Sequence, residues 1–181
     1  MACTTTTRAI DVLKHDGIIA HQTDTVYGLA CRPKEKLLRR LTEIKHRRHK
    51  QGFILLASQV SCLTEYIDCT PEEIEVLSEQ QPRPTTWLVN SKKGVAPALL
   101  GSTGKLAVRI TPHQTIKEIS ESVGAFASTS ANISNLQTCS NAEQIRRMFG
   151  PCVDHVEINA IPGTGLASKI VDLQSGQVIR N

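Results

Sequence analysis

Three hydroxyl side chains and an amide lie close together at residues 128–132, which are Ser-Thr-Ser-Ala-Asn. They follow the apolar run 125–127, which is typical of a buried strand. Polar groups at the end of such a strand are costly to bury without hydrogen-bond partners. Open α/β sheets bind ligands beyond the carboxyl ends of their strands, so these side chains are suited to hold a polar ligand. Taken alone, the segment fits a Ser/Thr turn or a helix N-cap better than a ligand site.

Two basic segments could bind an anion. Lys45 and Arg47 belong to the unbroken basic run 45–50, and side chains at i and i+2 share one face if the chain is extended there. Such a pair could clamp a phosphate or a carboxylate, with the arginine as a bidentate fork. Arg109 interrupts the apolar strand predicted over 105–110, where an arginine is rarely buried unless it is paired. We therefore expect Arg109 to meet either an acid of the protein or an anionic ligand.

The chemistry suggested by these residues is phosphoryl or nucleotidyl transfer. The chain has neither a GxxxxGK[ST] loop nor a GxGxxG fingerprint, so any nucleotide would be held by side chains and irregular loops. No nucleophile with an adjacent base is evident. Sites rich in hydroxyls and cations favour transfer chemistry, because positioning and charge neutralisation supply most of its rate. The segment 23–25, Thr-Asp-Thr, either adds hydroxyls to this site or forms a tight turn.

The elements that must position these residues alternate between strand and helix. Apolar spacing and capping signals predict helices near 7–16, 33–44, 71–81, 116–123 and 140–150, the last opened by a capping box of Ser140 and Glu143. Strands are predicted near 18–20, 26–30, 53–56, 85–89, 105–110 and 125–132, with a closing hairpin over 169–180. This alternation predicts an α/β fold over residues 1–181, a single domain with a twisted mixed sheet.

Composition excludes some classes of protein. The 181 residues carry a net charge of +4, and no apolar stretch approaches the length of a membrane span. The N-terminus lacks the apolar core of a signal peptide, so we predict a cytoplasmic protein with no membrane partner. The six cysteines form no Cys-x-x-Cys and do not pair with histidine at zinc spacing, which favours free thiols and no metal site in the protein.

Five segments in this order resemble the YrdC/TsaC family, and the resemblance covers nearly the whole chain. Each motif is weak alone, but together they are specific: Thr23-Asp24-Thr25-Val26-Tyr27-Gly28-Leu29, Lys45-His46-Arg47, Pro82-Arg83-Pro84-Thr85-Thr86, Val108-Arg109 and Ser128-Thr129-Ser130-Ala131-Asn132. The segment 168–173 looks like the closing motif of that family. The chain is similar to the short members, because longer ones carry a second C-terminal domain.

Members of this family are threonylcarbamoyl-AMP synthases. The resemblance implies a sheet with helices around an open, positive cavity. It implies a reaction that joins L-threonine, bicarbonate and ATP into threonylcarbamoyl adenylate and pyrophosphate, with Mg²⁺ on the triphosphate. Partner transferase proteins would then place the threonylcarbamoyl group on the adenosine beside the anticodon of tRNA.

The resemblance also assigns roles to residues. The catalytic pair that would bind the ATP phosphates is Lys45 and Arg47. The remaining nucleotide contacts would be Ser130, Asn132 and Arg180. The residues around the threonine would be Thr23, Arg109, Ser128 and Ser168, with Arg109 suited to the carboxylate.

Four positions depart from the family pattern. Gln22 and Arg48 stand where the family has proline, Arg83 replaces a glycine, and Lys169 replaces a threonine. None of these changes removes one of the candidate polar contacts.

Two other functions fit the residues. One is an RNA-binding module of the same fold without turnover, supported by the basic run 45–50, Lys92-Lys93 and Arg146-Arg147. Phosphate contacts from such residues give affinity without sequence choice. The other is a small-molecule-binding domain of a different pathway.

Overall fold

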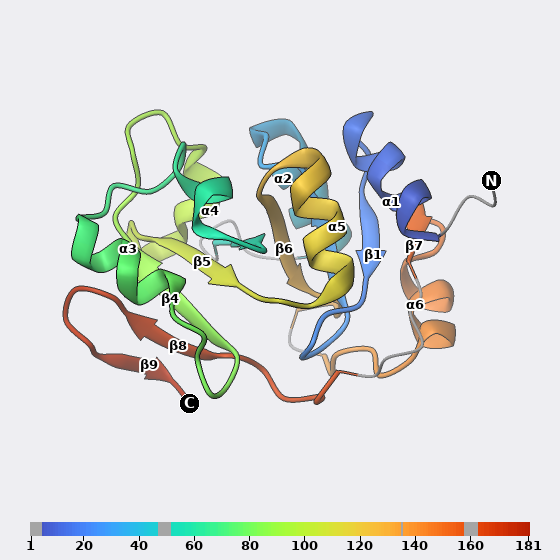
Figure 1. Cartoon of the computed structure of the whole chain (residues 1–181). Helices are drawn as coiled ribbons and strands as arrows, with labels where there is room; N and C mark the ends of the chain where they lie inside the picture. The colour runs from blue at the N-terminus through green and yellow to red at the C-terminus, as the bar shows by residue number, and fades with distance from the viewer. Residues whose placement is uncertain (1–4, 47–51, 135, 158–162) are drawn as a thin grey trace.

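All the strands that the structure describes belong to one mixed sheet. The computed structural model describes residues 5–46, 52–134, 136–157 and 163–181. The order across the sheet is β7-β1-β2-β6-β3-β5-β4-β8-β9, with α1 near one edge and the β8–β9 hairpin at the other (Figure 1). The strands are β1 (Ile19–His21), β2 (Gly28–Cys31), β3 (Ile54–Ala57), β4 (Thr85–Val89), β5 (Leu106–Ile110), β6 (Phe126–Ser130), β7 (His155–Val156), β8 (Lys169–Asp172) and β9 (Val178–Arg180).

Helices cover both faces of this sheet. They are α1 (Thr5–Lys14), α2 (Glu35–Ile44), α3 (Pro71–Ser78), α4 (Pro97–Leu100), α5 (Gln114–Val123) and α6 (Ala142–Phe149), with 3-10 turns at Val60–Leu63 and Gly101–Thr103. On one face, α1 and α5 lie side by side and bury a cluster that includes Leu13, Ile116 and Phe126 (Figure 1). On the other face, α2 packs Leu38 and Leu41 into the larger cluster. None of the helices in the described ranges is long and apolar enough to cross a bilayer.

The predicted mixed α/β fold is confirmed, and so are the predicted strands and helices, to within a few residues at their ends. Three pairs of neighbouring strands are parallel (β1–β7, β3–β5 and β4–β8) and the others are antiparallel. Two elements were not predicted, β7 and α4, because two and four residues are too few to show a period. Strand β6 lies between β2 and β3, although these two strands precede it in the sequence.

One local prediction was wrong, and the condition set for the Lys45–Arg47 clamp is not met. Helix α6 is capped by Asn141, whose side chain accepts from the Gln144 N–H, whereas Ser140 donates to the Gln144 side chain from outside the helix. A capping box does form at α3, where Thr70 and Glu73 exchange hydrogen bonds. The chain is not extended at 45–46 either. Lys45 keeps a helical conformation at the end of α2, and His46 has a φ of +48°.

Candidate functional site

A cavity of about 520 Å³ lies against one face of the sheet. Helices α1 and α5 pack on another part of the same face. Successive strand residues point to opposite faces, so alternate positions of one face line the cavity. On β6 these are Ser128 and Ser130, and on β5 they are Ala107 and Arg109. The polar residues of the lining that matter here are Thr23, Thr25, Thr86, Arg109, Ser128, Ser130, Ser168 and Arg180.

Arg109 is buried and paired within the protein. Its Nη2 donates to Asp24 Oδ1 at 2.5 Å, and its Nη1 donates to Thr25 Oγ1 at 3.0 Å. Its Nε is buried and has no hydrogen-bond partner among the described residues. Burial lowers the pKa of Arg109, and the Asp24 carboxylate partly offsets this effect. The expectation that Arg109 meets an acid of the protein is therefore confirmed. Arg109 also lines the cavity, and a role in binding an anionic ligand stays a prediction.

The segment 23–25 is a tight turn and part of the cavity wall at once. The Thr23 hydroxyl donates to Val26 O at 2.8 Å and accepts from the Thr25 N–H at 3.0 Å. Thr25 Oγ1 lies 2.8 Å from Thr23 Oγ1, so it accepts from Arg109 and donates to Thr23. The turn thereby fixes the hydroxyls and Asp24 around one guanidinium.

Lys45 joins the end of α2 to the segment that follows β6. Its side chain is 3% exposed, and its Nζ donates to Ser130 O and, at 3.1 Å, to Asn132 Oδ1. The Ser130 hydroxyl donates to the same Asn132 oxygen at 2.7 Å. Only Ser130 of these three residues lines the cavity; Lys45 and Asn132 support it from outside the lining. Arg47, the other member of the predicted clamp, lies outside the described residues.

Ser168 and Arg180 form the opposite wall, beside β4. The Ser168 hydroxyl lies 2.8 Å from Thr86 Oγ1, and Arg180 donates to Ser168 O from Nε at 3.2 Å and from Nη2 at 2.8 Å. Burial lowers the pKa of Arg180. Within the described residues, no carboxylate lies within 4 Å of this guanidinium. Arg180 therefore brings to the cavity a positive charge that no acid of the described residues neutralises. This charge is available to an anionic ligand.

The sequence reasoning missed His21, which contacts Ser128. His21 is fully buried at the end of β1, and its Nε2 lies 3.0 Å from Ser128 Oγ. The pKa of His21 is lowered to about 4, chiefly by burial; the hydrogen bond to the Gln22 carbonyl opposes this effect, and the nearby charges of His113 and Arg109 make smaller contributions that lower it. His21 lies on the same strand face as Ile19, which belongs to the apolar cluster. A polar residue at that position of a buried strand was the signal by which the sequence could have revealed it.

This buried histidine should make folding stability depend on pH. The folded pKa of about 4 lies below the ordinary value of 6.5, so the unfolded chain binds the extra proton between these values. Stability should fall by roughly 1.4 kcal/mol per pH unit, about 3 kcal/mol in all, as pH decreases from 6.5 to 4. Urea unfolding of the wild type and of His21→Phe at several pH values measures this effect. The variant should lack this part of the slope, and identical slopes would contradict the assignment.

A metal site within the protein finds no support in the described ranges, where no three His, Cys, Asp or Glu side chains gather as metal ligands. The five cysteines in these ranges form no disulfide with one another; Cys31 and Cys139 are buried, Cys62 and Cys69 are half-buried, and Cys152 is exposed.

The fold and this site define a known class of protein. A family model for the Sua5/YciO/YrdC domain, described as "Telomere recombination", matches residues 11–181. The chain belongs to this family, and the resemblance seen in its motifs is confirmed.

Both named enzymes and solved structures are similar to this chain. A threonylcarbamoyl-AMP synthase of Histophilus somni (strain 129Pt) is 31% identical over 179 residues, covering 96% of this chain and 97% of that protein. One of Mannheimia succiniciproducens is 34% identical, covering 94% and 96%. The structure of P. abyssi Sua5 complexed with L-threonine matches with a TM-score of 0.82 at 25% identity, covering 91% of this chain and 49% of that one. This chain therefore spans about half of that Sua5 protein. E. coli YciO shares the fold, with a TM-score of 0.79 at 21% identity, covering 96% and 87%.

Proposed function

We propose that this chain is a threonylcarbamoyl-AMP synthase that joins L-threonine, bicarbonate and ATP and releases pyrophosphate. The observation that carries the proposal is the cavity, which is lined by a buried arginine fork, a second guanidinium, and hydroxyls from β4, β6, the 23–25 turn and Ser168. The curated relatives of this name match nearly the full length of the chain. We also take residues 1–181 to be one domain, because one sheet contains strands from both ends of the sequence.

The amino acid would bind at the end of the cavity where Asp24 now holds Arg109. A carboxylate is what Arg109 already binds in the protein, so a substrate carboxylate would find matched geometry there. Thr23, Ser128 and Ser168 line the same cavity and would supply hydroxyls to the amino acid. Ser130 and Asn132, held by Lys45, together with Arg180 and Arg47, would bind the nucleotide and its phosphates.

The chemistry needs little from the protein besides position and charge. The neutral threonine amine forms a bond to the carbon of bicarbonate, and one bicarbonate oxygen leaves as water with a proton from the amine. The resulting carbamate is already anionic and needs no strong base for the next step. A carbamate oxygen then bonds to the α-phosphorus as the bond to pyrophosphate breaks, and nearby cations stabilise the leaving charge. Mg²⁺ would arrive on the triphosphate, held by phosphate oxygens and water.

Pyrophosphate release tests this function directly. We expect release that depends on threonine and bicarbonate together, with threonylcarbamoyl adenylate detected as the coupled product. Omitting threonine is the control for simple ATP hydrolysis. ATP binding without threonine-dependent pyrophosphate release would refute the proposed reaction. It would favour one of the two alternatives, the RNA-binding module or the small-molecule-binding domain.

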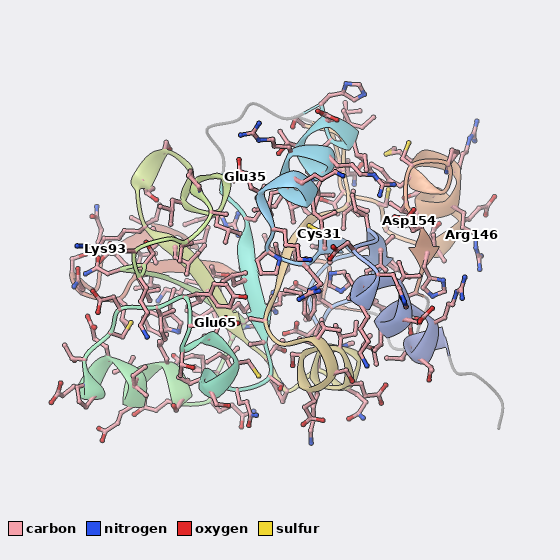
Figure 2. All side chains as sticks on the ribbon, turned by 90° about the horizontal axis from the view of Figure 1, so that it is seen from above. Cys31, Glu35, Glu65, Lys93, Arg146 and Asp154 are labelled. Carbon is pink, nitrogen blue, oxygen red and sulfur yellow. The ribbon has the colours of Figure 1, made fainter. Side chains whose placement is uncertain are left out.

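The product is a reactive mixed anhydride, so a tRNA threonylcarbamoyltransferase must take it over. We place both steps in the cytoplasm, where tRNA and ATP are available. Direct contact between this chain and tRNA would be weak and electrostatic. Two of the basic segments lie far apart, because Lys93 and Arg146 stand at opposite ends of the molecule (Figure 2). This separation disfavours the RNA-binding module as the main function.

Any RNA affinity should come from the run 45–50 and be separable from catalysis. Arg48, His49 and Lys50 follow the candidate clamp and lie outside the described residues. Changing all three to serine should reduce the salt dependence of RNA binding, because fewer counterions are released. Threonine-dependent synthesis should stay nearly intact. Filter binding across a salt series measures the first effect, and loss of synthesis in the triple variant would place these side chains in the active site instead.

A further inference from the structure

Three neighbouring strands bring a histidine and a serine together at the cavity. His21 pairs with Gly28 across β1 and β2, and Ser128 lies on β6, on the other side of β2. The two side chains meet above Gly28, with His21 Nε2 at 3.0 Å from Ser128 Oγ. A Cβ atom at Gly28 would lie 2.9 Å from each of these atoms. Glycine at this position is therefore what allows the contact.

The second ring nitrogen decides which way this hydrogen bond runs. His21 Nδ1 lies 3.2 Å from Gln22 O, and a carbonyl oxygen can only accept. Nδ1 therefore carries the proton of the neutral ring, and Nε2 is left with a lone pair. It follows that the Ser128 hydroxyl donates to His21. The ring is fully buried and packs edge-on against Phe126, with ring centroids 5.6 Å apart, so it is held in this orientation.

The orientation of Ser128 limits what it can bind. Its single hydroxyl proton is used by His21, so only oxygen lone pairs remain for the cavity. Ser128 can then accept a hydrogen bond from a ligand and cannot donate one. Arg109, on the same cavity wall, can only donate and suits a carboxylate. Ser128 can accept a hydrogen bond from an N–H or O–H group, and Arg109 can bind a carboxylate. An amino acid carries both kinds of group.

We propose that His21 is a positioning residue that turns the Ser128 hydroxyl so that the site selects an amino acid presenting an N–H or O–H donor at Ser128. This inference rests on the proposed function. The donor could be the nitrogen of the amino acid or the β-hydroxyl of threonine. The shared chemistry is a hydrogen-bond donor, and the choice of substrate separates the two.

Steady-state kinetics on five variants, one of them a double variant compared with its Ser128→Ala parent, test the proposal. His21→Phe keeps a buried ring and removes the acceptor, so the threonine KM should rise roughly tenfold while the ATP KM stays unchanged. His21→Gln restores a side-chain oxygen that can accept and should recover much of the loss. In a Ser128→Ala background, His21→Phe should add nothing, because His21 acts through Ser128. His155→Phe, on β7 and outside the cavity lining, is the matched control and should leave the threonine KM unchanged.

The substrate 2-aminobutyrate, which lacks the β-hydroxyl, identifies the donor. If the hydroxyl binds Ser128, His21→Phe should affect threonine and spare 2-aminobutyrate. If the nitrogen binds Ser128, both substrates should be affected equally. An unchanged threonine KM in His21→Phe would overturn the proposal, and so would an equal added effect of His21→Phe in the Ser128→Ala background.

A spectroscopic measurement separates this inference from the proposed reaction. The imidazole ¹⁵N shifts of His21 in the wild-type protein at neutral pH should show a protonated Nδ1 and an unprotonated Nε2. A protonated Nε2 would overturn the inference whatever the enzyme does. A wild type that shows this tautomer but no threonine-dependent pyrophosphate release would refute the proposed function and leave the orientation of Ser128 standing.

Discussion

Changing Arg109 to lysine should raise the threonine concentration needed for half-maximal turnover by roughly ten- to hundredfold. The change keeps the charge and removes the fork that can grip a carboxylate with two parallel hydrogen bonds. Losing a charge-assisted hydrogen bond typically costs about 1.5–3 kcal/mol, which corresponds to that range. ATP binding measured without threonine should change little. Threonine titration of pyrophosphate release, combined with calorimetric ATP binding, measures both quantities.

The ion pair with Asp24 makes a second role for Arg109 testable. Arg109 is 4% exposed, so loss of the pair could act on stability alone. Asp24→Asn is the matched control, because it removes the pair and keeps the guanidinium. It should lower the melting temperature and leave threonine affinity unchanged or stronger, since no carboxylate of the protein then competes for Arg109. If Arg109→Lys lowers the melting temperature with a normal threonine response, the ligand role is wrong.

Changing Lys45 to alanine should lower threonine-dependent pyrophosphate release by roughly ten- to hundredfold. Lys45 is 3% exposed, and its ammonium donates to both Ser130 O and Asn132 Oδ1. Removing it leaves two acceptors without their shared donor and takes a positive charge from the nucleotide end of the cavity. The rate and the ATP KM should both change, while the threonine KM is less affected. By resemblance, Arg47→Ala should act in the same direction.

A lysine elsewhere provides the control for Lys45. Lys92 is exposed and donates to Thr64 O at 2.7 Å, away from the cavity lining. Lys92→Ala should keep normal pyrophosphate release and normal ATP affinity. Unchanged release in Lys45→Ala, with the fold intact by circular dichroism, would remove Lys45 from the proposed site.

Local patterns in the sequence predicted most elements of the fold but not their arrangement. Strand β4 follows from a run of β-branched, aromatic and aliphatic residues, and helix α5 follows from helical apolar spacing. The position of β6 between β2 and β3 depends on contacts between residues far apart in the chain, which no local pattern encodes. Strand β7 has two residues and exists because β1 offers it a partner.

The residue types of the candidate site were predictable, but their pairing was not. Arg109 was recognised as an arginine that needs an anion, yet its partner Asp24 lies 85 residues away and meets it only in the folded sheet. The neighbouring pair Lys45 and Arg47 suggested an extended clamp, whereas Lys45 ends a helix and turns toward Asn132. The motif resemblance placed Ser128 near the substrate, but its hydrogen bond to His21 required coordinates.

The late position of β6 in the sequence sets the order in which this protein can become active during synthesis. Strands β2 and β3 leave the ribosome long before residues 126–130, and each has an unpaired edge until β6 fills the gap. Such edges are open to wrong pairing, and closing contacts over so long a chain is slow. At about 5–20 residues per second, the nascent chain spends several seconds with this slot empty. Ser128 and Ser130 take their places in the cavity wall in the same event that joins β2 to β3 through β6, so substrates cannot assist the folding steps that precede it.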